Sequence, residues 1–318
     1  MKSKLMVVKV AAILVAIVLF AVFPLFIQGY WIRVLTSLFM YAGMAEALNL
    51  MVGYAGYAAF GNGVFYGIGA YATAVLMTRF GWGFFQSMIV SALFAAFIAL
   101  VLGLPILRLR GHYFAIATIG VNMAIMELVT YIEITGGGKG ISLPIYSGDI
   151  VAQGRFFYYL MFSVLVASVI LTVWIVKSRF GYGLRAIKTE PEAAEVMGVN
   201  TTLYKVIAWS ISAFIFGLIG SISGYWLTFL EPIYVFDIMI SVECFVMVLL
   251  GGAGTILGPV IGAFSLETLS ELLWSRFTLW HLGILGLIIV LVVMFIPNGI
   301  MGIFKQSTFS LRKLFKSQ

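Results

Sequence analysis

The longest polar interval of this chain is KSRFGYGLRAIKTEPEAAEVMGVNTTLYK, residues Lys177 to Lys205, and long apolar segments flank it on both sides. Within it, Thr189-Glu190-Pro191-Glu192 matches a capping box, in which the first residue caps a helix and the fourth returns a hydrogen bond to it. Proline suits the first turn, where its missing N–H would have no partner. Gly198 suits the left-handed conformation that ends a helix. Because two turns of helix are unstable alone, we expect a short helix from Glu190 to Met197 that packs on the membrane domain or on a partner protein.

The composition is that of a membrane protein. Hydrophobic residues make up 63% and charged residues 10% of the 318 residues, and the mean hydropathy is +1.12. The net charge of +7 comes from basic residues at the ends of apolar segments, which indicates contact with anionic lipid and not with nucleic acid. The single cysteine, Cys244, excludes an internal disulfide. We therefore predict an all-α polytopic membrane protein with one transmembrane domain over residues 1–318.

A membrane span needs about 20 apolar residues, and the sequence contains ten candidates. They run from Leu5 to Ile27, Trp31 to Val52, Tyr57 to Thr78, Phe84 to Leu107, Tyr113 to Ile132, Phe157 to Val176, Ile207 to Leu230, Tyr234 to Leu250, Thr255 to Leu273 and Leu279 to Ile296. The third and the ninth are rich in glycine, so each is either a crossing span or a broken, re-entrant one. The first has no small-residue cleavage site at its end, which indicates a retained span and not a signal peptide.

The basic residues give an independent test of this topology. With ten spans and a cytoplasmic N-terminus, fourteen of the 19 fall on the cytoplasmic side. These are Lys2, Lys4, Lys9, Arg108, Arg110, Lys177, Arg179, Arg185, Lys188, Lys205, Lys305, Arg312, Lys313 and Lys316, against Arg33, Arg79, Lys139, Arg155 and Arg276 outside. The bias follows the positive-inside rule and predicts cytoplasmic termini, a cytoplasmic loop at 177–205 and a basic tail at 305–318.

Two glycine-rich segments interrupt the apolar pattern, one from Gly53 to Tyr71 and one from Leu249 to Ala263. Glycine costs a helix about 1 kcal/mol relative to alanine, so each cluster needs a reason. Close packing of helices through small residues is one reason, and an unwound stretch that lines the solute path is another. The two interpretations are compatible. The interpretation of an unwound stretch predicts a translocation path that includes Gly56, Gly61, Asn62, Gly63 and Gly254. We also place Glu243 on this path. The similarity of the two segments hints at a duplicated unit.

Five glutamates lie inside or near the ends of candidate spans: Glu46, Glu127, Glu243, Glu267 and Glu271. An acidic residue at the centre of a span costs about 3 kcal/mol, so these side chains are expected to face helices, water or solute. Interhelical hydrogen bonds explain them, and so does a proton or cation site. The two histidines, His112 and His281, have no partners at metal-ligand spacing, and no metal site is predicted.

The stretch Gly136-Gly137-Gly138-Lys139-Gly140 superficially suggests a phosphate-binding loop. It does not qualify, because a Walker A motif requires serine or threonine after the lysine. We find no nucleotide-hydrolysing motif elsewhere in the sequence either. The energy for transport is therefore expected from an ion gradient or from a separate ATPase.

Several motifs together resemble LivM-type permeases, the membrane subunits of branched-chain amino acid ABC importers. They are GYAG with FYGIGAY in the first glycine-rich segment, LRLRGHYFAIATIG at 107–120, TGGGKG at 135–140, Glu192-Ala193-Ala194-x-x-x-Gly198, and MVLLGGAGTILGP at 247–259. They occur in the order seen in that family and cover most of the chain after the first span. Glu46, His112 and Lys139 depart from the family pattern.

The resemblance implies a permease subunit with no ATPase site and no cofactor of its own. Glu192, Ala193, Ala194 and Gly198 would form its coupling helix, seated in a groove of the ATPase. The implied partners are a LivH-type second permease, two ATP-binding subunits and an extracytoplasmic solute-binding protein, in the cytoplasmic (inner) membrane of a bacterium or archaeon. The expected function is inward transport of branched-chain or other hydrophobic amino acids. The alternatives are a urea or amide importer and a secondary transporter driven through the buried glutamates.

Overall fold

The computed structural model describes residues 17–27, 29–109, 111–146 and 148–276, together with residues 15, 283, 286, 287, 290, 294 and 299–302. The predicted span at 5–27 lies partly outside these residues, and the predicted span at 279–296 lies almost entirely outside them. The predicted tail at 305–318 lies wholly outside them. Helices make up most of the described chain, and its two strands are two residues long.

Six stretches of the described chain are long and apolar enough to cross a membrane. They are Tyr30–Ala55, Phe84–Ile106, His112–Tyr131, Ile150–Lys177, Thr201–Leu227 and Pro232–Gly251. This confirms a helical, multi-pass membrane protein. The predicted total of ten spans and the cytoplasmic termini stay predictions.

The helices that form these stretches are joined by shorter elements. The spanning stretches contain α2 (Tyr30–Asn49) with the π-helical turn η2 (Leu50–Ala55), α4 (Phe84–Ile106), α5 (His112–Tyr131), α6 (Ile150–Lys177), α9 (Thr201–Leu227), and the pair α10 (Pro232–Val235) and α11 (Ile238–Gly251). The others are η1 (Phe23–Leu25), α3 (Gly63–Arg79), η3 (Glu133–Thr135), η4 (Gly137–Lys139), α7 (Arg179–Thr189), α8 (Pro191–Val196) and α12 (Gly258–Arg276).

Two predicted spans are not continuous helices. The third was expected from 57 to 78, but residues 56–62 have no regular helix and α3 begins only at Gly63. Its cluster of glycines explains this break. The eighth predicted span, from 234 to 250, is confirmed within the apolar stretch Pro232–Gly251, but the helix is interrupted: α10 ends at Val235 and α11 begins at Ile238. Asp237 starts the new helix by accepting a 2.9 Å hydrogen bond from the N–H of Met239.

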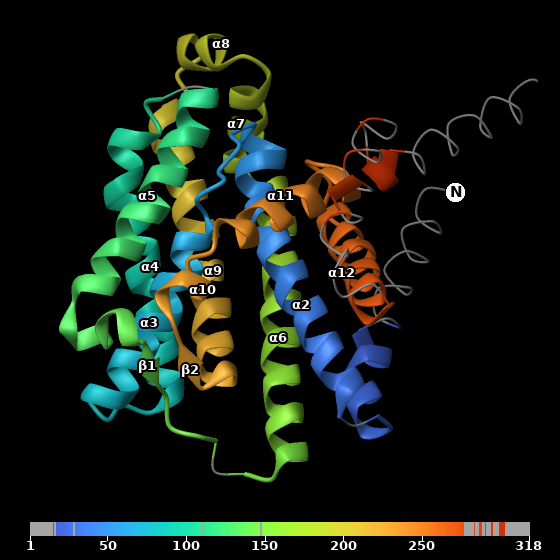
Figure 1. The fold of residues 1–318 in the computed structure, drawn as a ribbon. Coiled ribbons are helices and arrows are strands. Elements are labelled where there is room, and N and C mark those ends of the chain that lie inside the picture. Colours follow the sequence, from blue (N-terminus) through green and yellow to red (C-terminus); the bar gives the residue numbers. More distant parts are fainter. Residues whose placement is uncertain are drawn as a thin grey trace, which may run out of the picture.

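The helices run side by side between two ends of the molecule (Figure 1). Helices α7 and α8 lie at one end, and the strands β1 (Ile141–Ser142) and β2 (Phe229–Leu230) lie toward the other. The strands pair antiparallel, with Ile141 opposite Leu230 and Ser142 opposite Phe229. This pairing joins the loop before α6 to the loop after α9.

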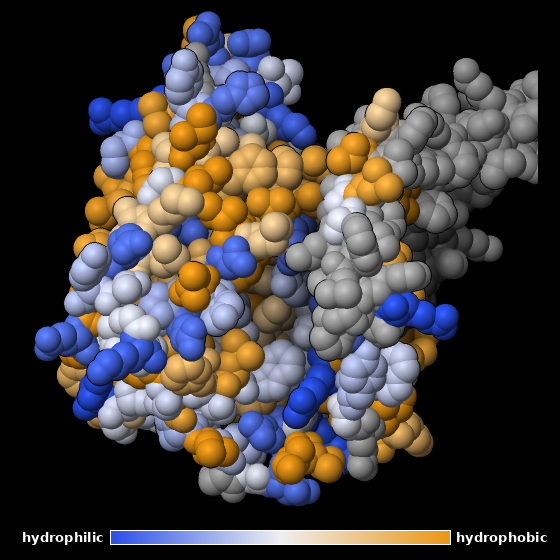
Figure 2. Space-filling view, in the orientation of Figure 1, coloured by the Kyte–Doolittle hydropathy of each residue, from blue (hydrophilic) through white to orange (hydrophobic). Residues whose placement is uncertain are grey.

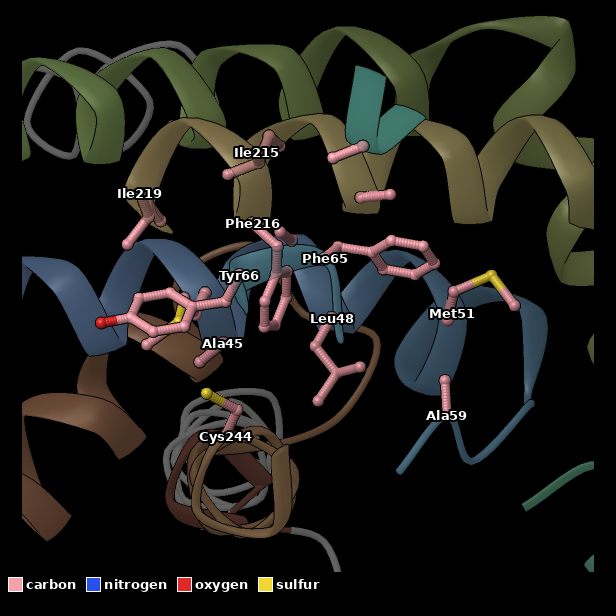
Figure 3. Close-up of a cluster of buried hydrophobic side chains, with 14 of the residues drawn as sticks. Ala45, Leu48, Met51, Ala59, Phe65, Tyr66, Ile215, Phe216, Ile219 and Cys244 are labelled. Atoms are coloured by element: carbon pink, nitrogen blue, oxygen red, sulfur yellow. The ribbon is translucent and has the colours of Figure 1, made fainter. Parts of the chain in front are cut away.

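The core lies where α9 packs against α3 and α4, while α2 packs against α6 and α12. Small residues bring α3 and α9 into close contact. The Ser221 hydroxyl lies 3.2 Å from the Gly69 carbonyl oxygen, and a Cβ on Gly69 would lie 2.2 Å from the Gly217 carbonyl oxygen. The core cluster in Figure 3 draws on four helices and contains Leu48, Phe65, Phe216 and Cys244.

Candidate functional site

Helix α8 ends where the sequence predicts, at Gly198, whose φ of 85° lies in the left-handed region. The N–H of Gly198 donates to the Glu195 carbonyl at 2.9 Å, and the N–H of Val199 donates to the Ala194 carbonyl at 3.0 Å. These two bonds form a Schellman motif, which satisfies carbonyls at the end of the helix. The predicted stop at Gly198 is confirmed.

The predicted capping box at the start of α8 is wrong. Thr189 is the last residue of α7, and its hydroxyl donates to the Arg185 carbonyl at 3.0 Å. Glu190 occupies the N-cap position with φ −155° and ψ 100°, and no side chain caps the helix. A residue that precedes proline avoids the helical region, so Pro191 places the helix boundary at Glu190.

The outer side of α8 is exposed. Ala194 is 4% exposed, whereas Val196 and Met197 are 87% and 84% exposed. Of the predicted coupling residues, Glu192, Ala193 and Gly198 are exposed as well. Figure 2 shows hydrophilic side chains gathered at this end of the molecule, above a band of hydrophobic ones. An exposed apolar pair within a polar surface suits a docking site for another protein.

Helix α7 is an element that the sequence reasoning missed. The Ser178 hydroxyl accepts from the N–H of Gly181 at 3.4 Å, and Leu184 and Ile187 are buried on one face. A serine followed by this i, i+3 spacing of apolar residues is the signal that could have found the helix. Helix α7 contacts α8 and η2, so it joins the exposed tip to the first glycine-rich segment.

Two lysines contact the first glycine-rich segment, one just before its unwound part and one within it. Lys188, in the last turn of α7, donates to the Gly53 carbonyl at 2.7 Å. Lys205, only 4% exposed in α9, donates to the Tyr57 hydroxyl at 3.1 Å. Between these two points Gly56 has a φ of 78°. Both lysines belong to the polar interval 177–205. The end of this interval is already part of α9, which begins at Thr201.

The second glycine-rich segment lies against the first. Asn49, fully buried at the end of α2, accepts from the N–H of Gly254 and donates to the Thr255 carbonyl, both at 2.9 Å. A Cβ on Gly53 would lie 2.3 Å from the Gly254 nitrogen, so a side chain at Gly53 has no room. The two segments therefore form one junction beside Lys188.

Asn62 and Gly63 lie in a buried polar cluster deeper in the bundle. The Asn62 side chain donates to the Ser212 hydroxyl at 3.0 Å and accepts from the Trp209 indole N–H at 2.7 Å. The N–H of Gly63 donates to the Ser241 hydroxyl at 2.6 Å. The cluster joins α3, α9 and α11 at the point where α3 begins.

Gly61 lies where the first glycine-rich segment is both unwound and closely packed, and its place on a solute path stays a prediction. Its N–H donates to the Thr118 hydroxyl at 3.2 Å, and a Cβ at this position would lie 1.9 Å from the Thr118 carbonyl oxygen. The stretch is unwound and also closely packed against α5. Of the predicted path residues, Gly61, Asn62 and Gly63 lie together, while Gly56 and Gly254 lie near Lys188.

Asn122 and Asp237 border the same cluster, and sequence reasoning missed both. Asn122, in α5, is 2% exposed and donates to the Phe236 carbonyl at 2.7 Å, while its Oδ1 has no hydrogen-bond partner. Asp237 follows Phe236 and is exposed. An aspartate before an apolar run, as an N-cap, is the signal that could have revealed the start of α11.

The glutamates are distributed over several helices. Glu46 is fully buried in α2, and neither of its carboxylate oxygens has a hydrogen-bond partner. Glu243 interacts with Tyr41 of α2 and Glu267 of α12, so this predicted path residue lies toward those helices. Within the described residues, no group of three or more His, Cys, Asp or Glu side chains could hold a metal ion.

The family described as branched-chain amino acid transport system, permease component, matches residues 30–293. The chain is 28% identical over 322 residues to the high-affinity branched-chain amino acid transport system permease protein LivM of Escherichia coli strain K12, covering 92% of this chain and 75% of that protein. It is 23% identical over 288 residues to the permease protein LivH of the same strain, covering 82% of this chain and 91% of that protein. No solved structure matches the chain. The chain therefore belongs to the branched-chain amino acid transport system permease family.

Proposed function

We propose that this chain is the permease subunit of an ABC importer that moves branched-chain or other hydrophobic amino acids inward, driven by separate ATP-binding subunits. One observation carries the proposal: the exposed helix α8 is joined through α7 and Lys188 to Gly53, at the end of the α2 span. If a partner protein binds α8 and moves it, this connection would transmit the movement to the broken span and so to the solute path. The names of the relatives LivM and LivH support the solute class.

The coupling helix would use the residues that the motif predicts together with Val196 and Met197, which the motif does not specify. Ala194 packs inward and fixes α8 on the bundle, while Val196 and Met197 face outward as an apolar contact for the ATPase. Glu192 and Ala193 are exposed beside them, and Gly198 provides the tight end of the helix. An interface with an apolar centre and a polar rim fits this arrangement.

The partners follow from the same proposal. Similarity to both LivM and LivH supports pairing with a LivH-type permease, because two related chains can form a pseudo-symmetric pair. Two ATP-binding subunits would use the ATP, and this chain would need no cofactor. A solute-binding protein would dock at the opposite end, over the β1–β2 pairing. With that sidedness, the proposal expects cytoplasmic termini and a location in the inner membrane.

The solute path would run along the unwound residues 56–62 and their contacts. Gly56 and Gly254 lie near the α7 end, and Gly61, Asn62 and Gly63 lie deeper. Glu243 would border the path from α11. Backbone that leaves the helix within a membrane protein is tolerated where it is buried in protein or lines a cavity.

Site-directed cross-linking tests the docking surfaces. Val196→Cys would place a thiol on α8, and Ile145→Cys, at a position 78% exposed, would place one near β1. The native Cys244 is fully buried and contributes little background. We expect Val196→Cys to cross-link to the ATP-binding subunit and Ile145→Cys to cross-link to the binding protein. Cross-linking of Val196→Cys to the binding protein would reverse the proposed sidedness.

A further inference from the structure

We propose that the break between α10 and α11 recognises the ammonium group of the transported amino acid, with Asp237 and Asn122 as its acceptors. The inference rests on the proposed transport function and adds to it the chemical group of the solute that is bound. It also assigns residues outside both glycine-rich motifs.

The proposed site lies near the middle of the membrane. Asn122 stands near the centre of α5, which puts it roughly 15 Å from either end of that helix at 1.5 Å per residue. Ser212, which contacts the same cluster through Asn62, stands well inside α9. A solute that crosses between the two ends of the bundle therefore passes this depth.

Asp237 is an exposed carboxylate at that depth. Its Oδ1 accepts from the N–H of Met239 at 2.9 Å, which caps α11, and the side chain stays exposed. The residues around it are apolar or aromatic and also exposed: Ile233, Tyr234 and Met239. A carboxylate in the membrane interior is unfavourable against lipid, so Asp237 must face water, a cationic group or a partner subunit. A zwitterionic amino acid with an apolar side chain matches both the carboxylate and its surroundings.

Asn122 provides a second acceptor, whose orientation is fixed. Its side-chain N–H donates to the Phe236 carbonyl at 2.7 Å, and rotating the amide would place Oδ1 against that carbonyl instead. Oδ1 is therefore the free atom, and it has no partner although the residue is 2% exposed. Buried acceptors without partners are rare in folded proteins, and an orphaned one beside a helix break points to a ligand.

Gly63, the first residue of α3, lies between the backbone of Asp237 and the side chain of Asn122. A Cβ on Gly63 would lie 3.4 Å from the Asp237 carbonyl oxygen and 3.9 Å from Asn122 Oδ1. The same Cβ would lie 3.0 Å from the Ser241 hydroxyl, so a side chain at this position would press on that hydroxyl.

The chemistry of the site selects the class of ligand. An ammonium group has three N–H donors and needs acceptors, and a carboxylate with an amide oxygen supplies charge and directed hydrogen bonds. Urea and simple amides carry no positive charge and would gain little from Asp237. The site therefore favours amino acids over the neutral solutes of related importers.

A charge-removing variant with a matched control tests the proposal. Asn caps a helix about as well as Asp, so Asp237→Asn removes the charge and retains the cap. Asp149 is also an exposed aspartate that caps a helix, accepting from the N–H of Ile150 at 2.8 Å at the start of α6. Asp149→Asn is therefore the control. Each variant would be assembled with the second permease, the ATPase and the binding protein in proteoliposomes.

We expect Asp237→Asn to raise the KM for leucine uptake roughly tenfold or more, as when a hydrogen bond to a charged group is lost. Asp149→Asn should behave as the unmodified importer. Unchanged uptake kinetics in Asp237→Asn would overturn the proposal, and so would equal losses in both variants. If Asp237→Asn does not assemble, Asn122→Ala removes the second acceptor, together with the hydrogen bond to the Phe236 carbonyl, and must show the same rise in KM.

Direct competition identifies the recognised group. The permease and ATPase complex in nanodiscs, without binding protein, would be incubated with radiolabelled leucine and either isoamylamine or 4-methylpentanoate. We expect the amine to displace leucine and the acid to be much weaker, and the reverse order would overturn ammonium recognition. Failure of the proposed function is distinguishable, because the unmodified importer would then show no ATP-dependent leucine uptake at all.

Discussion

The Nζ atom of Lys188 lies 2.7 Å from the carbonyl oxygen of Gly53. This bond fastens the last turn of α7 to the π-helical turn that ends the second span, and a positive charge at such a C-terminal carbonyl is favourable. Gly254 of the second glycine-rich segment packs against the same carbonyl. A displacement of α8 would therefore reach both segments through one side chain.

Replacing Lys188 should separate ATP hydrolysis from transport. Lys188→Met loses a charge-assisted hydrogen bond of about 1.5–3 kcal/mol, and we expect leucine uptake per ATP to fall roughly tenfold or more. Lys188→Arg should retain most coupling. Lys177→Met, at an exposed position in the last turn of α6, removes the same charge and should have no effect. Equal uptake per ATP in Lys188→Met and Lys177→Met would contradict the role of Lys188.

Chemical rescue shows whether the ammonium acts after assembly. Lys188→Cys would be assembled into the importer and then treated with 2-bromoethylamine, which converts the cysteine to a lysine analogue. Lys188 is exposed, whereas the native Cys244 is fully buried, so the reagent should select position 188. We expect uptake to return after treatment. A folded, assembled complex that stays inactive after complete modification would argue against transmission through this side chain.

Close packing at Gly61 should make it intolerant of a side chain. Gly61→Ala would place a Cβ 1.9 Å from the Thr118 carbonyl oxygen, whereas a Cβ on Gly120 in the same neighbouring helix meets nothing within 4 Å. We expect Gly61→Ala to cost about 1–3 kcal/mol or more through overpacking, and Gly120→Ala to stabilise by up to about 1 kcal/mol. Thermal unfolding in detergent measures both. Equal melting temperatures would show that the unwound segment is not packed as described.

Asn49 should hold the two glycine-rich segments together. Asn49→Ala removes both hydrogen bonds to residues 254 and 255 and leaves those backbone groups without partners, at a cost of about 2–4 kcal/mol. Asn49→Asp retains the acceptor for the Gly254 N–H, but its ionised form loses the donor to the Thr255 carbonyl and buries a charge. We expect it to melt below the unmodified protein, with a smaller loss at low pH, where the protonated carboxyl can donate to that carbonyl.

Substitution of Glu46 distinguishes an ATP-driven importer from an ion-driven carrier. Its carboxylate is fully buried and neither oxygen is hydrogen-bonded, so Glu46→Gln should leave ATP-driven uptake unchanged. Replacing an unsatisfied buried group by an apolar one is neutral or stabilising, and Glu46→Leu should melt at the same or a higher temperature. Loss of uptake in Glu46→Gln, in a complex that still hydrolyses ATP, would favour transport driven through this glutamate.

Local rules predicted the features that depend on neighbours in sequence. Gly198 ends α8 because its left-handed φ is a property of one residue, and the glycine cluster at 53–63 breaks a span because glycine disfavours helix. The capping box failed for a local reason too: Pro191 restricts Glu190, and this effect outweighs the cap offered by Thr189.

Contacts between distant segments could not be predicted in this way. Asn122 meets Phe236, and Asn49 meets Gly254, only after α5, α11 and α2 have packed together. Lys205 looked like a loop cation because it ends the polar interval 177–205, yet it is buried and donates to the Tyr57 hydroxyl. The residues that connect the broken spans are thus set by helix packing and not by the local pattern.

ATP-dependent uptake of radiolabelled leucine into proteoliposomes tests the central proposal most directly. The vesicles would hold this chain, a LivH-type permease, the ATPase and the binding protein, with Gly198→Asp as the comparison at a position where φ is 85°. We predict uptake that requires ATP, survives collapse of the proton gradient and is lost in Gly198→Asp while the subunits still assemble. Uptake that needs only this chain and a proton gradient would contradict it.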